Sequence, residues 1–164
     1  MRRAVFYVLA TVLFVLLHTL LTKFLAIGNI VPDIIVVWIV YVAIREGQIA
    51  GLAVGFASGL AIDLLSGQDG MLGLAALAKT LAGFVAGYFH NENKTFQILG
   101  GYELIVAIGV ASLVHNVVYF IIFLQGTEIG WLSAIVFYGI PSSLYTAALG
   151  LLPMFGFGYK YGSG

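Results

Sequence analysis

A small or acidic residue recurs at every fourth position over residues 47–63. These residues are Gly47, Gly51, Gly55, Gly59 and Asp63. On an α-helix this spacing creates one face with almost no side-chain volume, so a second helix backbone can approach it closely. The next apolar run carries a matching series, Ala75, Lys79, Gly83 and Gly87. Residues 66–70, which are rich in turn formers, separate the runs and predict an antiparallel pair packed glycine face to glycine face.

Two charged residues lie on this predicted pair. Asp63 is near the end of the first helix, and Lys79 is roughly two turns into the second. Side chains on a helix lean toward its own N-terminus, which brings these two together in an antiparallel pair. We therefore predict that Asp63 and Lys79 form an ion pair that fixes the register of the two helices.

The composition identifies the environment of these helices. Hydrophobic residues make up 62% of the 164 residues and charged residues only 9%, and the mean hydropathy is +1.08. A soluble protein has about 25% charged residues, so an integral membrane protein is predicted. The net charge of +0 argues against nucleic acid as a partner. The absence of cysteine excludes disulfides and thiolate chemistry.

The chain divides into six hydrophobic segments joined by short links. These segments cover residues 4–27, 32–44, 49–65, 72–89, 104–124 and 131–154. The second is about 20 Å long as a helix, which is short for a hydrocarbon core of about 30 Å. Pro141 predicts a kink near Phe137 in the last segment, and residues 90–101 form the one sizeable polar link. We predict an all-α fold, a single polytopic bundle of six transmembrane helices over residues 1–164.

The basic residues predict the orientation of this bundle. With a cytoplasmic N-terminus, five of them lie on the cytoplasmic side, namely Arg2, Arg3, Arg45, Lys94 and Lys160. Lys23 is then the only basic residue near the outer ends of the segments. This is the positive-inside pattern, and it predicts that both termini are cytoplasmic.

Most of the buried polarity falls in the predicted outer half of the membrane. The candidate cluster consists of Asp33, Asp63, Lys79, His18, His115 and Asn116. A charged residue in mid-helix costs about 2.5–3.5 kcal/mol, so Lys79 must face protein or water. Two interpretations stay open. The cluster is either structural, with the Asp63–Lys79 pair at its centre, or a polar pocket open to the outside that receives a ligand or partner.

Other chemistry has little support in the sequence. His18, His115 and a carboxylate could in principle bind a metal, but they are on three different segments without a spacing signature. There is no Gly-rich loop ending in Lys-Ser/Thr, and no serine or threonine has a base at motif spacing. We therefore expect no catalytic residue, no cofactor and no metal.

One combination of motifs resembles a known family. It comprises Pro32-Asp33, the run 41–47 (Tyr-Val-Ala-Ile-Arg-Glu-Gly), the glycines at 51, 55 and 59, Asp63-Leu64-Leu65-Ser66-Gly67, Gly70, Gly73-Leu74, Ala76-Leu77, Lys79 and Gly83. This combination resembles the bacterial rod shape-determining membrane protein family MreD. The resemblance is close over about a third of the chain, and the six-segment size is similar over its full length.

The resemblance implies a non-enzymatic subunit of the cell-elongation machinery in the bacterial cytoplasmic (inner) membrane. Such a subunit would bind MreC, a single-span protein, and act with MreB, RodA and the elongation penicillin-binding transpeptidase in peptidoglycan synthesis. We expect the Leu104–Phe123 face, with Tyr102 and Glu103, and the short second segment to leave room for the partner helix.

The family is also similar in fold to the substrate-binding subunits of energy-coupling-factor vitamin transporters, and a transport receptor is the alternative function. Such a receptor would carry an Ala-x-x-x-Ala motif on its first helix, where this chain has only Ala4, Ala10 and Ala26. Its ligand-gripping loop would need more than residues 28–31. These two features favour the scaffold.

Overall fold

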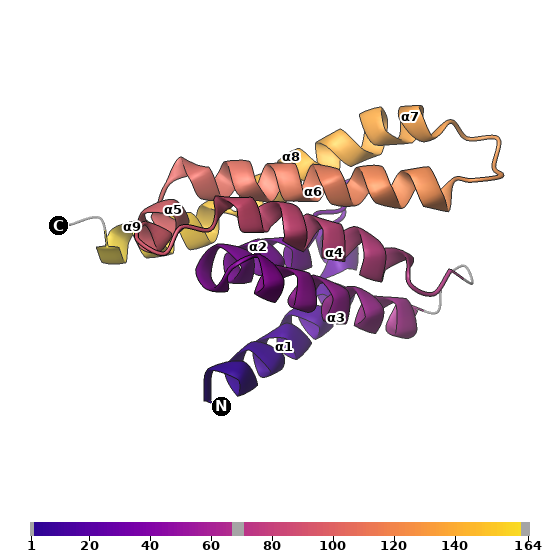
Figure 1. The fold of residues 1–164 in the computed structure, drawn as a ribbon. Coiled ribbons are helices and arrows are strands. Elements are labelled where there is room, and N and C mark those ends of the chain that lie inside the picture. Colours follow the sequence, from indigo (N-terminus) through magenta and orange to yellow (C-terminus); the bar gives the residue numbers. More distant parts are fainter. Residues whose placement is uncertain (1, 67–70, 162–164) are drawn as a thin grey trace.

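The computed structural model describes residues 2–66 and 71–161, and helices make up the regular structure of these residues (Figure 1). The helices are α1 (Arg2–Leu25), α2 (Ile34–Glu46), α3 (Gln48–Ser66), α4 (Leu74–Ala86), α5 (Thr95–Gly100), α6 (Tyr102–Phe123), α7 (Trp131–Ala134), α8 (Ile140–Leu149) and α9 (Leu151–Tyr161). A 3₁₀ turn, Gly87–Phe89, extends α4, and a π-helical segment, Ile135–Gly139, joins α7 to α8. The all-α fold predicted from the sequence is confirmed.

Four helical stretches in the described chain are long and apolar enough to cross a membrane. They are Arg2–Leu25, Gln48–Leu65, Tyr102–Phe123 and Trp131–Gly158. The fourth predicted segment forms a shorter apolar stretch, Leu74–Phe89, and α2 has 13 residues. Since about 20 residues span the hydrocarbon core, α2 and α4 are short elements within a bundle of longer ones.

Helices α3 and α4 pack backbone against backbone through their glycines. A Cβ added at Gly59 would lie 2.5 Å from the Ala75 carbonyl oxygen, and one at Gly83 would lie 2.6 Å from the Gly51 carbonyl carbon. Real Cβ atoms essentially never make contacts this short. At Gly87 the added atom would meet Gln48 Cα at 2.5 Å. Only residues without a side chain permit this approach.

Gly47 has a different position from the one the spacing predicts. It ends α2 rather than lying on α3, with a φ of 94° and its N–H donating to the Ala43 carbonyl. A residue with a side chain rarely adopts this φ, so Gly47 serves the turn between α2 and α3. The prediction that Gly47 belongs to the packing face of α3 is therefore wrong. The turn residues 67–70 lie outside the described residues.

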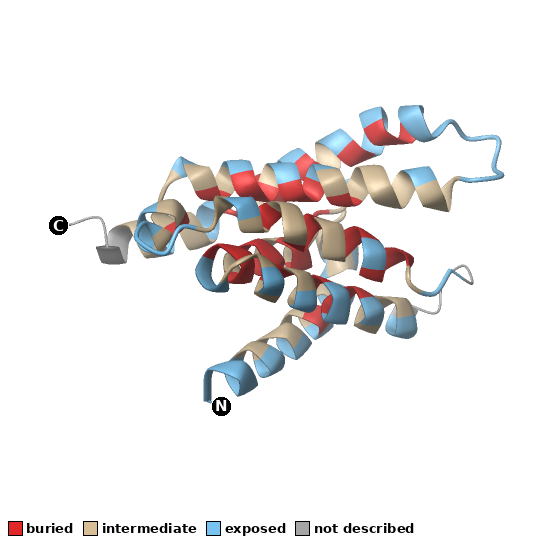
Figure 2. Cartoon of the chain, viewed as in Figure 1, coloured by how far each residue is buried: buried red, intermediate tan, exposed pale blue. Residues whose placement is uncertain are grey.

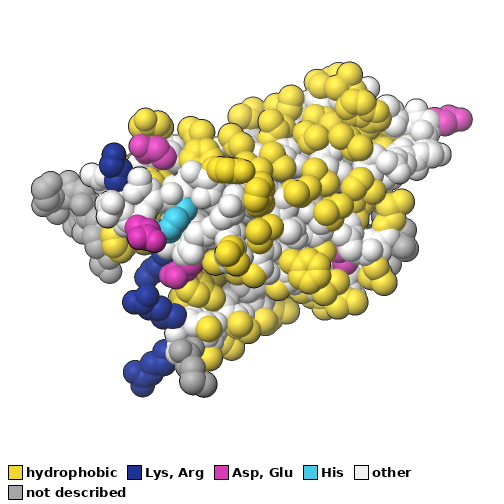
Figure 3. Space-filling view, viewed as in Figure 1, with side chains coloured by type: hydrophobic (Ala, Val, Ile, Leu, Met, Phe, Trp, Pro, Cys, Tyr) yellow, Lys and Arg dark blue, Asp and Glu magenta, His cyan; other side chains and the backbone are white. Residues whose placement is uncertain are grey.

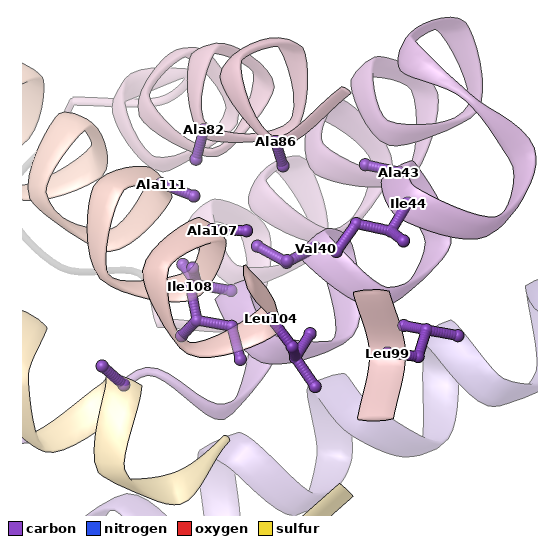
Figure 4. Packing of buried hydrophobic residues seen from close by; sticks show 12 residues of the cluster. Val40, Ala43, Ile44, Ala82, Ala86, Leu99, Leu104, Ala107, Ile108 and Ala111 are labelled. Atoms are coloured by element: carbon purple, nitrogen blue, oxygen red, sulfur yellow. The ribbon is translucent and has the colours of Figure 1, made fainter. Parts of the chain in front are cut away.

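Helix α2 is the centre of the bundle. Its buried residues are Ile35, Val36, Trp38, Ile39, Val40, Val42, Ala43 and Ile44. Figure 4 shows Ala82 and Ala86 of α4 and Ala107 and Ala111 of α6 around Val40, where the small side chains let three helices meet. Figure 2 shows the same concentration of buried residues on the facing sides of α2, α4 and α6. One side of α2 nevertheless borders an apolar cavity of about 470 Å³, lined in part by Ile34, Val37 and Tyr41. The room expected beside the second segment for a partner stays a prediction.

The link after α4 is more ordered than the sequence predicted. Residues 95–100 form α5, and Leu99 is fully buried in the same core as Val40. The last segment is irregular where a kink was predicted near Phe137: the π-helical segment Ile135–Gly139 precedes Pro141 in the first turn of α8. Proline cannot donate a backbone hydrogen bond, and a wider turn accommodates its ring.

Helix α1 is the most peripheral of the long helices. Val15 is its one buried residue, and its N-terminal end diverges from the other helices in Figure 1. Two hydrogen bonds tie it to α2. Trp38 Nε1 donates to Thr11 Oγ1 at 3.0 Å, and Tyr7 Oη donates to Glu46 at 2.6 Å.

Candidate functional site

Lys79 and Asp33 form the central ion pair of the buried polar cluster. The Lys79 ammonium donates a hydrogen bond to Asp33 Oδ2, and the side chains are 3% and 13% exposed. The pair joins α4 to the start of α2, two elements that are far apart in the sequence. The structure describes no ion pair between Lys79 and Asp63, so the predicted partner of Lys79 was wrong.

Asp33 is held in place as the N-cap of α2. Its Oδ1 accepts hydrogen bonds from the backbone N–H groups of Ile35 at 3.0 Å and Val36 at 3.2 Å. Its own N–H donates to Thr146 Oγ1 of α8 at 2.9 Å. The first N–H groups of a helix have no partner within the helix, and a carboxylate at the N-cap satisfies them and suits the helix dipole. One carboxylate therefore caps α2 and neutralises Lys79.

Asp63 performs the corresponding task for α4. Its carboxylate accepts from the backbone N–H groups of Gly73 at 3.0 Å, Ala75 at 3.1 Å and Ala76 at 3.0 Å. The residue at the N-cap position of α4 is Gly73, with a φ of 99° and no side chain to offer. The end of α3 therefore supplies the missing cap, which ties the two helices together at the side of the turn.

Two histidines face the Asp33 carboxylate from either side. His18 Nδ1 of α1 lies 3.9 Å from Asp33 Oδ1, and His115 Nε2 of α6 lies 3.6 Å from Asp33 Oδ2. These distances are too long for direct hydrogen bonds. His115 also interacts with the Ala78 backbone, yet the Nδ1 atoms of both rings are buried without a hydrogen-bond partner among the described residues.

The sixth predicted residue, Asn116, lies beside this group and bonds in another direction. Its Nδ2 donates to the Gly139 carbonyl at 3.1 Å and to Ser143 Oγ at 3.0 Å. These bonds attach α6 to the end of the π-helical segment and to α8, and the Gly139 carbonyl also accepts from Ser143 Oγ at 2.8 Å. The sequence analysis did not identify the hydroxyl groups of α8 that also bond beside Asp33 and Asn116. Ser142 donates to the Val31 carbonyl at 2.6 Å, and Thr146 accepts from Asp33.

Two adjoining cavities open around Asp33. The smaller, of about 200 Å³, includes Asp63, Lys79, Met71 and Phe123 in its lining. The larger, of about 350 Å³, includes Asn29, Asn116, Tyr138 and Ser142. Both are lined by His18, Asp33, His115 and Tyr119. The structure thus brings all six predicted polar residues to one or both cavities.

The charged groups of the site bond to helix N-termini and to one another. The carboxylates of Asp33 and Asp63 are engaged by backbone N–H groups, and Asp33 also by Lys79. No group of three or more His, Cys, Asp or Glu side chains in the described chain could hold a metal ion. The cavities are lined by the residues of the polar cluster and by aromatic side chains.

The opposite end of the molecule carries a different set of charges. Figure 3 shows the Lys and Arg side chains of the visible face gathered at the end that holds the N-terminus, while apolar side chains cover most of the rest. Arg45 there donates to the Tyr41 hydroxyl and lies 3.6 Å from Glu46. Two polar ends therefore flank a broad apolar zone.

The family model described as rod shape-determining protein MreD matches residues 1–159. No curated protein and no solved structure matches the chain.

Proposed function

Because this chain belongs to the MreD family of rod shape-determining membrane proteins, we propose that it is a non-enzymatic scaffold subunit of the bacterial cell-elongation machinery. The observation that carries the proposal is the family match, which covers residues 1–159 of 164. The family is a shape-determining family rather than an enzyme family. The site agrees with this, since its charged groups are engaged with backbone and with one another.

The proposed partner is a single-span protein of the MreC type, through which the chain acts with MreB, RodA and the penicillin-binding transpeptidase in peptidoglycan synthesis. The exposed face of α6 supports such a contact. Its exposed large apolar residues are Tyr102, Val106, Val110, Leu113 and Ile121. They recur at spacings of three, four and eight, so they form a continuous stripe on one face of the helix.

The proposed topology has six segments in the cytoplasmic membrane with both termini inside. The basic end shown in Figure 3 supports the cytoplasmic assignment of that end. Helix α2, at about 20 Å, does not reach across the hydrocarbon core by itself. Irregular backbone is tolerated at membrane depth where protein or a water-filled cavity surrounds it. The cavities around Asp33 would supply that environment on the outer side.

Depletion of the chain in its rod-shaped host tests the function. We expect rounded, swollen cells, while uptake of any single vitamin stays normal. Extraction of a tagged copy should recover an MreC-like protein at a fixed ratio. Val110→Arg on the α6 stripe should reduce that recovery, because an unpaired charge would enter the helix contact. Phe24→Arg on α1, at a residue that is 85% exposed, is the matched control and should leave recovery unchanged.

Two results would contradict the proposal. Normal cell shape on full depletion would contradict the scaffold function. Recovery with a pair of ATPases, together with starvation for one small nutrient, would instead establish the transport receptor.

A further inference from the structure

The two cavities around Asp33 have hydrogen-bonding capacity that the protein does not use. Among the described residues, Lys79 donates to Asp33 alone, and an ammonium group has three donors. The Nδ1 atoms of His18 and His115, which line both cavities, are also without partners. Buried polar groups are normally satisfied by protein, water or a ligand. This site therefore has several groups available to something that enters it.

The charges at the site define what can enter. One cation, Lys79, faces two carboxylates, Asp33 and Asp63. Each carboxylate also accepts from the first N–H groups of a helix, α2 or α4, and each helix N-terminus contributes roughly half a positive charge. The net charge of these groups around the cavities is therefore close to zero. A phosphate or other anion would be repelled by two carboxylates, and an ammonium group would be repelled by Lys79.

The walls of the cavities add an apolar requirement. The smaller cavity is lined by Ile62, Met71, Leu74 and Phe123, and the larger by Phe120 and Tyr138. Tyr119 lines both. Ligand sites commonly have volumes of about 300–1,000 Å³. The larger cavity, at about 350 Å³, falls in that range by itself.

We propose that the cavities around Asp33 bind an uncharged, oxygen-rich head group of an amphiphile, with hydroxyl, ester or amide oxygens on Lys79 and the two histidines. The apolar part of the molecule lies along the aromatic and aliphatic walls. This ligand site goes beyond the scaffold function and does not depend on which protein partner the chain recruits.

The histidines supply a direct readout of binding. The chain has three, His18, His90 and His115. The first and last line both cavities, whereas the His90 ring bonds to the Ile44 carbonyl near the far ends of α2 and α4. Full-length protein labelled with ¹⁵N-histidine in phosphatidylcholine nanodiscs would be titrated with dodecyl maltoside, dodecyl phosphate and dodecyltrimethylammonium. The three probes share one chain length and differ in head-group charge.

We expect dodecyl maltoside to shift the imidazole signals of His18 and His115 saturably, to leave His90 unchanged, and to bind at least about tenfold more tightly than either charged probe. Free maltose should bind more weakly than its dodecyl derivative. Tighter binding of the phosphate or the ammonium probe would overturn the assignment of an uncharged head group. Equal binding of free maltose would overturn the amphiphile, and no saturable shift at His18 or His115 would overturn the site.

Two neighbouring residues provide matched variants. Met71 lines the smaller cavity and is 41% exposed, whereas Leu72 is 72% exposed and lines neither cavity. Met71→Trp should obstruct the cavity and weaken dodecyl maltoside binding by roughly tenfold, and Leu72→Trp should leave it unchanged. Equal affinities of the two variants would place the probe elsewhere on the protein.

Discussion

Replacing Lys79 by methionine tests the central contact of the cluster. The substitution keeps the length of the side chain, removes its charge and leaves the Asp33 carboxylate in a site where it is 13% exposed. Breaking one partner of a buried ion pair costs about 3–5 kcal/mol. Asp33 would keep its bonds from the Ile35 and Val36 N–H groups, so we expect the lower end, about 3 kcal/mol.

Asp33→Asn should cost a similar amount, because it leaves the ammonium of Lys79 buried without its partner. The double variant should be different. Asparagine caps a helix about as well as aspartate, and methionine needs no counter-charge. We therefore expect the double variant to lose no more than either single variant, against an additive sum of about 6 kcal/mol. This is a coupling of at least about 3 kcal/mol, at the upper end for contacting residues.

The assay is unfolding of the purified protein by sodium dodecyl sulfate in mixed micelles, followed by the fluorescence of Trp38, which is 6% exposed. Asp63 provides the control. Asp63→Asn combined with Lys79→Met should be close to additive, because the Asp63 carboxylate bonds to the start of α4 instead. Additivity in the Asp33–Lys79 cycle, or stronger coupling of Lys79 to Asp63, would refute the assignment.

Three further outcomes follow from the packing, the capping and the charges. Gly55→Leu should greatly reduce folded protein in the membrane, because even an added Cβ would lie 2.8 Å from the Lys79 carbonyl carbon. Phe56→Leu, at a residue that is 53% exposed, should leave the amount of folded protein unchanged, and size-exclusion chromatography measures both. Asp63→Ala should lower the free energy of unfolding by about 1–2 kcal/mol through loss of the α4 cap, and Asp63→Asn by less in the same assay. Topology reporters at both termini and after Lys94 should read cytoplasmic and one at Glu128 extracytoplasmic, while a periplasmic signal after Lys94 would overturn the six-segment count.

The glycine spacing predicted the helices of the α3–α4 pair because the information is local. A glycine every four residues can serve only a close approach on one face, and the short link leaves the following helix as the natural neighbour. The charged pair could not be predicted in this way. The local pattern indicated Asp63, on the neighbouring helix, as the partner of Lys79, whereas the structure pairs Lys79 with Asp33. Choosing between them requires knowing that the start of α2 lies against α4, which is long-range packing.

A capping signal was nevertheless present at both carboxylates. Asp33 follows Pro32 directly before an apolar run, which is typical of a helix N-cap. The start of α4 has Gly73 where a capping side chain would be expected, so its N–H groups must find an acceptor elsewhere. Asp63, across the turn, was available. Counting unsatisfied helix ends would have assigned both carboxylates before their charges were considered.

Helix α5 and the hydroxyl groups of α8 were harder to predict. The sequence around α5 is polar at its start, and one side chain, Leu99, supplies its fully buried contact. A single apolar residue gives no period to detect. Ser142, Ser143 and Thr146 were visible as polar residues in an apolar segment. The partners of Ser142 and Thr146, which are the Val31 carbonyl and the Asp33 N–H, lie more than a hundred residues earlier in the chain, where no local pattern connects them.

The short length of α2 accounts for the whole cluster in physical terms. A helix that starts inside the protein leaves its first N–H groups without water, so it needs an acceptor there, and Asp33 provides one. A carboxylate in that position needs a cation, and Lys79 provides it. The ammonium then has donors beyond the one that Asp33 accepts, and these require water or ligand oxygens. Filling the cavities with apolar side chains would strand those donors. A polar cavity beside α2 is therefore the consequence of ending this helix within the bundle, and its contents are part of the folded state.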